Sequence, residues 1–326
     1  MIITRTPLRI SLGGGGTDLP SYYTQRGGFV LAAAIDKYIF IGLNRTFSND
    51  YTIKYSALEK VATIEEIRHP IVREVLAHHD VPPAVEVVSL ADIPAGTGLG
   101  SSGAFTVGLL RAVYALRREH VHASALAEEA CRIEIDRLEQ PVGKQDQYIA
   151  SFGSLTCFDF GRDGRVAASP LAISDVTMHE LEEHLLMFFT GYSREATDVL
   201  ADQKQRSEQR ENVMLENLDQ TKSLGFAIKD ALERDDARRV GELMHEHWLN
   251  KRARSDNMTN PDIDRWYQTG IENGAVGGKL VGAGAGGFLM FYADNAAKLR
   301  KAMANAGLAE VRFSFDHEGS KLLVRD

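Results

Sequence analysis

Small and hydroxyl-bearing residues cluster in one stretch of the chain, residues 94–104, where an apolar run meets a helical pattern. Glycine lets a backbone approach a ligand closely, and the free N–H groups at the start of a helix attract anions. Serines at such a helix start can also bind a phosphate oxygen or a Mg²⁺ ion beside it. The residues predicted to form this phosphate site are Gly96, Gly98, Leu99, Gly100, Ser101 and Ser102.

The glycine spacing of this stretch also allows other interpretations. It is not a Walker P-loop, because no lysine follows the last glycine before the serines. Residues 98–103 do satisfy the G-x-G-x-x-G spacing of dinucleotide-binding proteins, which would suit a nicotinamide-dependent oxidoreductase. That fold would next require a second parallel strand, but residues 124–137 have a helical pattern. A glycine turn with a purely structural role is the remaining alternative.

Two carboxylates follow the glycine stretch. Glu134 interrupts the apolar face of a helix predicted to extend from Ser124 to about residue 138, and a buried carboxylate needs a cation. Either Arg137 or the Mg²⁺ of a bound nucleotide could supply that cation. Asp146 lies in the first turn of a short predicted helix, where the helix dipole alone would favour an acid. A catalytic role for Asp146 is the alternative.

Two further glycine-rich loops lie near the ends of the chain. The run Gly13–Gly16 is followed by Thr17 and Asp18, a hydroxyl and a carboxylate that are suited to gripping sugar hydroxyls. A turn capped by Asp18 is the simpler reading. The loop within residues 274–288 lies between two predicted strands, and such a loop can close over a ligand placed by another domain.

Two basic residues are candidate ligands for a substrate. Lys144 could hold Asp146 ionised or meet a substrate phosphate, and its alternative is a solvated loop lysine. Arg194 follows an apolar run and could reach back to a substrate, although a loop arginine more often forms a surface ion pair.

The composition limits the class of protein. A chain of 326 residues predicts two domains of about 150 residues each, which we place at residues 1–168 and 169–326. A net charge of -8 disfavours a nucleic-acid surface. No apolar run approaches a membrane span, and the first residues lack the apolar segment of a signal peptide. We therefore expect a cytoplasmic protein without nucleic-acid or membrane partners.

The element pattern predicts α+β domains. Residues 28–35 and 38–44 are rich in β-branched and aromatic residues, and the intervening Asp36-Lys37 suggests a hairpin. Residues 197–250 have a helical pattern, in which we expect packing and no chemistry. Strands at residues 311–315 and 321–324 would complete the second domain.

Three glycine loops, with an acidic pair after the second, resemble the motifs of the GHMP small-molecule kinase superfamily, which includes galactokinase, homoserine kinase and mevalonate kinase. The matching segments are residues 7–18, 94–104 and 279–288. Within the superfamily the chain is most similar to kinases of D-glycero-D-manno-heptose 7-phosphate, through residues 13–18 and the segment Gly143-Lys-Gln-Asp-Gln-Tyr148. The resemblance spans nearly the whole chain.

The resemblance implies an α+β, two-domain GHMP-kinase-like architecture with the active site in the cleft between the domains. It implies ATP bound at the 96–102 loop and Mg²⁺ held by Ser102 and Glu134. Asp146 would act on the acceptor hydroxyl, and Arg9 would lie near it and the transferring phosphoryl group. The residues implied or considered as substrate ligands are Gly15, Gly16, Thr17, Asp18, Lys144, Arg194 and Gly284. Gly15-Gly16 replace the Glu-His pair of the galactokinase branch.

The implied reaction transfers the γ-phosphoryl group of ATP to the anomeric hydroxyl of a heptose 7-phosphate. The product, heptose 1,7-bisphosphate, would serve the synthesis of nucleotide-activated heptose. An unphosphorylated sugar such as fucose or galactose is the alternative substrate. Two alternatives from other classes are the nicotinamide-dependent oxidoreductase and a nucleotide-binding sensor without turnover. The expected partners are ATP and a sugar phosphate, and a homodimer is compatible with this reading.

Overall fold

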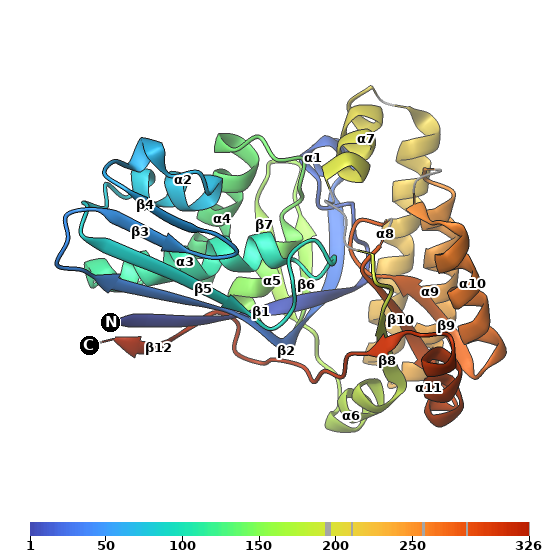
Figure 1. Cartoon of the computed structure of the whole chain (residues 1–326). Helices are drawn as coiled ribbons and strands as arrows, with labels where there is room; N and C mark the ends of the chain where they lie inside the picture. The colour runs from blue at the N-terminus through green and yellow to red at the C-terminus, as the bar shows by residue number, and fades with distance from the viewer. Residues whose placement is uncertain (193–196, 210, 256–257, 285, 326) are drawn as a thin grey trace.

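Two β-sheets organise the fold (Figure 1). The computed structural model describes residues 1–192, 197–209, 211–255, 258–284 and 286–325. Within these ranges the first sheet has eight strands and the second has four. The first sheet contains β1 (Ile2–Gly13), β2 (Gly28–Arg45), β3 (Tyr51–Lys54), β4 (Leu58–Val61), β5 (Val85–Ala91), β6 (Leu155–Phe160), β7 (Val166–Pro170) and β12 (Lys321–Arg325). The second contains β8 (Leu185–Phe189), β9 (Ala275–Leu280), β10 (Phe288–Ala293) and β11 (Ala309–Glu310).

The strand β2 is the longest element of the first sheet. It runs without interruption from Gly28 to Arg45, so the predicted hairpin is wrong. Asp36 and Lys37 lie opposite a register shift between Pro7 and Leu8 of β1, where they form a bulge. A bulge absorbs two extra residues without reversing the chain. As a result the first half of β2 pairs with β6 and the second half with β5.

The helix α3 lies at the centre of the first half of the molecule. It packs against β1, β2 and α5, and its residues 103–110 are all buried.

The helices are α1 (Pro20–Arg26), α2 (Pro70–His78), α3 (Ser101–Arg117), α4 (Ala123–Cys131), α5 (Gln145–Phe152), α6 (Asp175–His184), α7 (Thr197–Glu208), α8 (Asn212–Glu233), α9 (Ala237–Arg252), α10 (Pro261–Glu272) and α11 (Ala296–Asn305), with a 3₁₀ turn (Ile64–Glu66) and a π-helical turn (Arg132–Arg137). None of the helices in the described ranges is long and apolar enough to cross a membrane.

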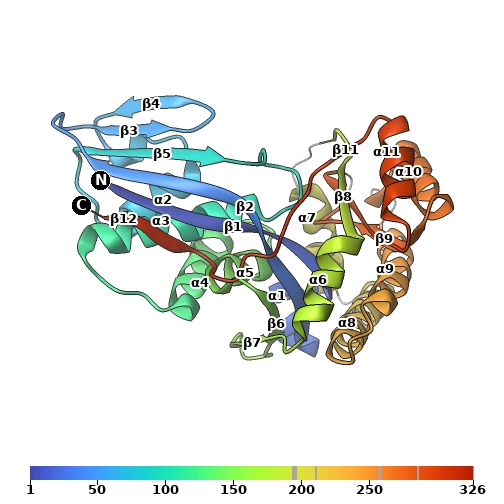
Figure 2. The ribbon, with the colours of Figure 1, turned by 90° about the horizontal axis from the view of Figure 1, so that it is seen from below.

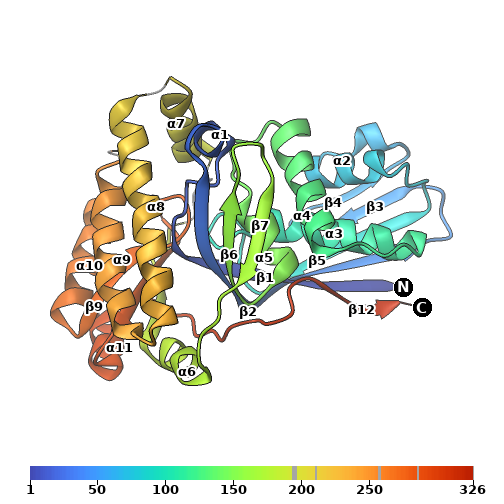
Figure 3. The same cartoon turned by 180° about the vertical axis from the view of Figure 1, so that it is seen from behind.

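The second sheet is buried on both faces. Along β8, Leu185 and Met187 join the large core that continues into the first sheet, whereas Leu186 and Phe188 join a second cluster with α10 and α11. Successive residues of a strand point to opposite faces, which explains this alternation. The helices α8 and α9 lie side by side, and α9 packs on β9 (Figure 3). The two halves therefore share one continuous core, and the boundary at residues 168 and 169 stays a prediction.

The C-terminal segment returns to the first sheet. β12 pairs antiparallel with β1, so both termini lie at the same end of the molecule (Figures 1 and 2). The prediction that this strand completes the second domain is therefore wrong. The predicted strand at residues 311–315 is also wrong, because β11 ends at Glu310 and only Phe315 forms an isolated bridge, with Ile35.

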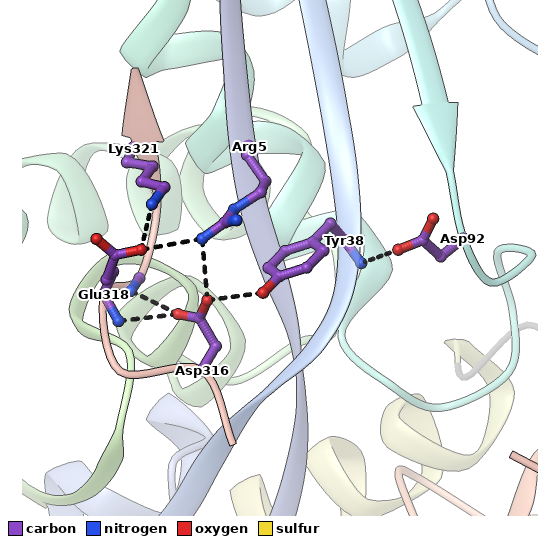
Figure 4. Close-up of polar contacts among 7 residues, drawn as sticks. Arg5, Tyr38, Asp92, Asp316, Glu318 and Lys321 are labelled. Carbon is purple, nitrogen blue, oxygen red and sulfur yellow. Dashed lines mark hydrogen bonds and ion pairs between the residues drawn. The ribbon is translucent and has the colours of Figure 1, made fainter. Parts of the chain in front are cut away.

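A polar network holds this returning segment in place (Figure 4). The Asp316 carboxylate accepts hydrogen bonds from Arg5 of β1 at 3.3 Å and from the hydroxyl of Tyr38 of β2 at 3.0 Å. Arg5 also binds Glu318 at 3.1 Å. Because Asp316 is buried, its paired charge fixes the C-terminal segment against the two central strands. This contact links the end of the chain to its beginning.

Candidate active site

A cavity of about 970 Å³ lies where the two halves of the molecule meet. The three glycine-rich segments of the sequence all contribute to its lining, as do the start of α5 and one face of α9. The residues of the predicted site that line it are Arg9, Gly15, Gly16, Asp18, Gly96, Gly98, Gly100, Ser101, Ser102, Asp146 and Gly284. The tertiary structure thus brings together residues from both ends and the middle of the chain.

The central glycine loop has the backbone geometry that the sequence predicts. Gly96, Gly98 and Gly100 have φ angles of 76°, 82° and 76°, and Gly100 is the N-cap of α3. A Cβ atom on Gly98 would lie 2.8 Å from the carbonyl oxygen of Val281, so the middle and last glycine loops pack backbone against backbone. Leu99 contributes differently, since its side chain is buried in the core. The start of α3 lines the cavity, and free amides at a helix start are suited to binding an anion.

Arg9 and Asp146 form an ion pair at the edge of this loop. Arg9 Nε lies 2.7 Å from Asp146 Oδ1, and the Arg9 guanidinium also donates to the Gly98 carbonyl. The Arg9 backbone N–H donates to the Leu99 carbonyl at 3.0 Å. Arg9 is buried, whereas the Asp146 side chain keeps 25% of its surface exposed to the cavity. The carboxylate is therefore held in a fixed orientation while one side stays open to a ligand.

Glu134 lies below the start of α3, in the π-helical turn. It accepts hydrogen bonds from the hydroxyl of Ser102 and, at 2.7 Å, from Gln147 Nε2. Complete burial raises the pKa of the Glu134 carboxyl to about 7, and the nearby Asp146 charge adds to the shift. Arg137 does not neutralise it, since Arg137 pairs with Glu74 at 3.2 Å. Of the two cations that the sequence left open, the arginine is excluded.

The first glycine run is tied to the start of α5 through Asp18. Asp18 Oδ1 accepts the Gly16 N–H at 2.9 Å, and Oδ2 accepts the Gln145 N–H at 3.1 Å. Burial raises the pKa of the Asp18 carboxyl. Thr17 lies outside the cavity lining, and its hydroxyl accepts the Phe29 N–H at 3.0 Å. Asp18 thus positions the loop from within the site, whereas Thr17 anchors it to β2.

The remaining candidate ligands have different positions. Lys144 points away from the cavity lining, because its ammonium binds the Glu128 carboxylate at 2.7 Å and the Gly164 carbonyl at 3.0 Å. Arg194 lies outside the described residues. Gly284 lines the cavity with a φ of 133°. The structure therefore gives no support to Lys144 as a ligand for a substrate phosphate.

Sequence reasoning missed four cavity residues on the second half of the molecule. His247, Lys251, Arg254 and Lys279 all line the cavity and are buried. His247, and Gln203 of α7, belong to residues 197–250, where the sequence predicted only packing; the structure places both of them in the cavity lining. The spacing of four and then three residues between His247, Lys251 and Arg254 could have revealed them, because such residues share one helix face.

Two family models match the chain. The N-terminal domain of GHMP kinases matches residues 63–154, and the C-terminal domain matches residues 228–309. The first match includes the glycine loop, Glu134 and Asp146, and the second includes the basic residues of α9 and β9. The matched residues thus include cavity residues from both halves of the molecule.

Similar proteins agree with these matches. The D-glycero-alpha-D-manno-heptose 7-phosphate kinase of Campylobacter jejuni is 32% identical over 337 residues, covering 98% of both chains. The mevalonate kinase of Methanothermobacter thermautotrophicus is 26% identical over 80% of this chain and 82% of its own length. The crystal structure of a D-glycero-D-manno-heptose 1-phosphate kinase from Bacteroides thetaiotaomicron superimposes with a TM-score of 0.82 at 24% identity, over 99% of both chains, which confirms the expected fold. The chain therefore belongs to the GHMP kinases, a family of ATP-dependent small-molecule kinases.

Proposed function

We propose that the protein transfers the γ-phosphoryl group of ATP to the anomeric hydroxyl of a heptose 7-phosphate, giving heptose 1,7-bisphosphate. The observation that carries the proposal is the Arg9–Asp146 ion pair, which lies beside the glycine loop and faces the same cavity. The similarity to the Campylobacter jejuni kinase, which covers nearly the whole chain, supports the substrate class. The product fits the synthesis of nucleotide-activated heptose.

The acceptor chemistry rests on Asp146. Phosphoryl transfer requires little more than alignment of the acceptor hydroxyl with the γ-phosphorus and neutralisation of charge. The Asp146 carboxylate is positioned to orient that hydroxyl and to take its proton. Arg9, held by Gly98 and Asp146, supplies a fixed positive charge between the acceptor and the phosphates. Two close contacts restrict Asp146 further, because a Cβ on Gly100 or Gly103 would lie 3.2 Å or 2.8 Å from its side chain.

The donor nucleotide binds through backbone rather than side chains. The left-handed glycines of the 96–100 loop and the first amides of α3 form a cradle that suits the phosphates of ATP. A side chain at Gly98 would force this loop away from the last glycine loop, because its Cβ would lie 2.8 Å from the Val281 carbonyl oxygen.

The chemistry of Ser102 and Glu134 fits a Mg²⁺ site. Mg²⁺ prefers hydroxyl and carboxylate oxygens, and a buried carboxylate with no cationic partner among the described residues needs such an ion. Bound there, Mg²⁺ would neutralise charge on the nucleotide phosphates. Gln147 fixes the second oxygen of Glu134, so that the first remains directed at Ser102 and the loop.

A release assay for ADP tests this function. The purified protein is incubated with ATP and Mg²⁺ and with D-glycero-D-manno-heptose 7-phosphate, the unphosphorylated heptose, fucose or galactose. We expect ADP release with the heptose 7-phosphate and a new phosphate resonance at the anomeric carbon. Faster turnover of fucose or galactose would assign the alternative substrate. Binding of NAD⁺ in place of ATP, without ADP release from any sugar, would refute the kinase assignment.

A further inference from the structure

Three cations from the second half of the molecule line the cavity that Asp146 also lines. Lys251 belongs to α9, Arg254 follows that helix, and Lys279 lies on β9. Figure 1 labels both elements. Their exposed fractions are 5%, 5% and 3%, yet all three line the cavity. Buried cations are costly unless an anion or several hydrogen bonds compensate them. The groups that compensate the buried charges of these three residues therefore indicate whether the residues are structural or bind a ligand.

Only neutral groups of the described residues bind these cations. Lys279 Nζ donates to the Leu12 carbonyl at 3.0 Å, and Lys251 Nζ donates to the carbonyls of Leu280 and Gly282. Among the described residues no carboxylate lies within ion-pair distance of these three cations, although the Asp18 charge partly offsets the effect of burial on the pKa of Arg254. An ammonium group has three N–H donors, so Lys279 has donors to spare.

Arg254 is held by three side chains in a fixed orientation. It donates to Asn217 Oδ1 at 2.9 Å, to Gln203 Oε1 at 3.0 Å and to Thr221 Oγ1 at 2.8 Å. A guanidinium has five N–H donors, so two are available to a further ligand. A planar, pre-oriented guanidinium is suited to binding two oxygens of one phosphate.

His247 provides an independent sign that a ligand is missing. It is 98% buried and lines the cavity, but neither ring nitrogen has a hydrogen-bond partner among the described residues. Burial, together with the charges of Lys279 and Lys251, lowers the pKa of His247 well below its usual value, so the ring is neutral. A neutral imidazole can donate one hydrogen bond to an anion.

The electrostatics also call for an anion at this place. Burial lowers the pKa of Lys279 to about 7, and the positive charges of Arg9 and Arg254 contribute to the shift. Burial and the same kind of repulsion lower the pKa of Lys251. A phosphate among these groups would reverse the repulsion and satisfy the free donors together.

The three cations and His247, here called the cation cluster, lie beside Gly15 and Gly16, which are predicted to bind the sugar. A Cβ atom on Gly16 would lie 2.9 Å from Arg254 Nη1, and Gln203 binds the Gly16 carbonyl at 2.9 Å. Gly15, next in the chain, faces Gln145, the neighbour of Asp146. A sugar on the Gly15-Gly16 backbone would thus have Asp146 on one side and Arg254 on the other.

We propose that Lys251, Arg254 and Lys279, together with His247, form the site for the phosphate group that the sugar substrate already carries. This inference rests on the proposed sugar-phosphate kinase function. The acceptor hydroxyl of the sugar lies at Asp146 and the sugar's own phosphate lies at the cluster, on residues other than those assigned to ATP. Recognition of that phosphate makes the enzyme select phosphorylated sugars over free ones.

The test compares Lys251→Met and Arg254→Met with Arg252→Met. Arg252 lies on the same helix but pairs with Asp264 at 3.0 Å, outside the cavity lining, so it is a matched control. Steady-state kinetics are measured with heptose 7-phosphate and with free heptose. We expect kcat/KM for heptose 7-phosphate to fall about 30-fold or more in the two cluster variants, the effect of losing a charged hydrogen bond. For free heptose we expect a loss at least about 10-fold smaller, and the KM of ATP should change less than the KM of heptose 7-phosphate; in Arg252→Met all constants should stay within about 3-fold.

Thermal shift provides a second readout that does not need turnover. Heptose 7-phosphate or inorganic phosphate is added to protein saturated with a non-hydrolysable ATP analogue and Mg²⁺, which fills the glycine loop. We expect a phosphate-dependent rise in Tm for the unmodified protein and the Arg252→Met variant, and none for the cluster variants. Methionine removes a buried cation but also leaves the carbonyls and side chains that it bound without a donor, so each shift is measured against the Tm of the same ligand-free variant. Arg254→Lys keeps the charge without the planar fork and should retain part of the shift.

The outcomes separate the cluster from the proposed function. Equal losses with phosphorylated and free heptose, or a higher KM for ATP alone, would overturn the cluster as the substrate-phosphate site. If none of the heptose phosphates leads to ADP release by the unmodified protein, the proposed function fails. In that case the thermal shift still tests the cluster. A phosphate-dependent rise in Tm that persists in the cluster variants overturns the cluster as a phosphate site, whereas loss of that rise supports an anion site at the cluster.

Discussion

Replacement of Glu134 by glutamine tests the magnesium site through stability rather than through rate. The Glu134 carboxyl has a pKa of about 7 in the folded protein, against a reference pKa of 4.5 in the unfolded chain. Because the folded value is raised, the group's contribution to stability is complete below pH 4.5 and is lost as the pH rises through 7. The difference of about 2.5 units corresponds to about 3 kcal/mol at full ionisation.

The Glu134→Gln variant carries no such penalty at any pH. In EDTA, the free energy of unfolding of the variant relative to the unmodified protein should therefore rise by about 2 to 3 kcal/mol between pH 5 and pH 8.5. With an unfolding entropy of about 2.1 cal/mol/K per residue, this corresponds to a relative gain of about 4 °C in Tm. Urea denaturation followed by tryptophan fluorescence measures the first quantity, and calorimetry measures the second.

The control for this experiment is Asp136→Asn, which removes an exposed acid from the same π-helical turn. Its relative stability should stay flat over the same pH range. Mg²⁺ with ATP should stabilise the unmodified protein more than the Glu134→Gln variant, and the variant should need about 10-fold more Mg²⁺ for half-maximal rate. A relative stability of Glu134→Gln that does not change with pH would refute the reasoning, since it would show that Glu134 is already compensated in the metal-free protein.

Three further substitutions probe other parts of the site. Asp146→Asn should lower kcat by about 1,000-fold with less than about 3-fold loss of ATP affinity. A near-normal rate would contradict a catalytic role and leave Asp146 as an acid that only stabilises the start of α5. Gly98→Ala should abolish binding of a non-hydrolysable ATP analogue in calorimetry, because its Cβ would lie 2.8 Å from the Val281 carbonyl at a φ of 82°; normal binding would contradict the cradle. Lys144→Gln should lower the free energy of unfolding in urea by about 1 to 2 kcal/mol, because the Lys144 ammonium loses its bonds to Glu128 and Gly164. Its kinetic constants should stay within about 2-fold. A rise in KM for the sugar would instead identify Lys144 as a substrate ligand.

Local features of the site could be predicted because their causes are local. Left-handed φ angles at Gly96, Gly98 and Gly100 follow from the residue type, and the start of α3 follows from the change to a helical pattern. The first-turn position of Asp146 is equally local. The ion pair between Arg9 and Asp146 joins residues 137 positions apart, and only the family resemblance indicated it.

The failures of sequence reasoning have a common physical origin in strand pairing. Asp36-Lys37 has the composition of a turn, yet β1 offers a continuous edge along which β2 continues through a bulge. β12 has no local property that assigns it to β1 rather than to the second sheet. Pairing partners are set by the whole fold, so propensity alone decides neither case.

The cation cluster was missed for a different reason, which bears on how the site works. Across the chain as a whole acids exceed bases by eight, so composition argues against an anion site. Within the cavity, however, the second half contributes the cations Lys251, Arg254 and Lys279, whereas the first half contributes the acids Asp18 and Asp146 together with Arg9. Each set is destabilised by its own burial and repulsion, as the raised pKa of Asp18 and the lowered pKa of Lys279 show. A magnesium nucleotide and a phosphorylated sugar would supply the opposite charge to both sets at once, so binding of the two substrates would stabilise the contact between the halves.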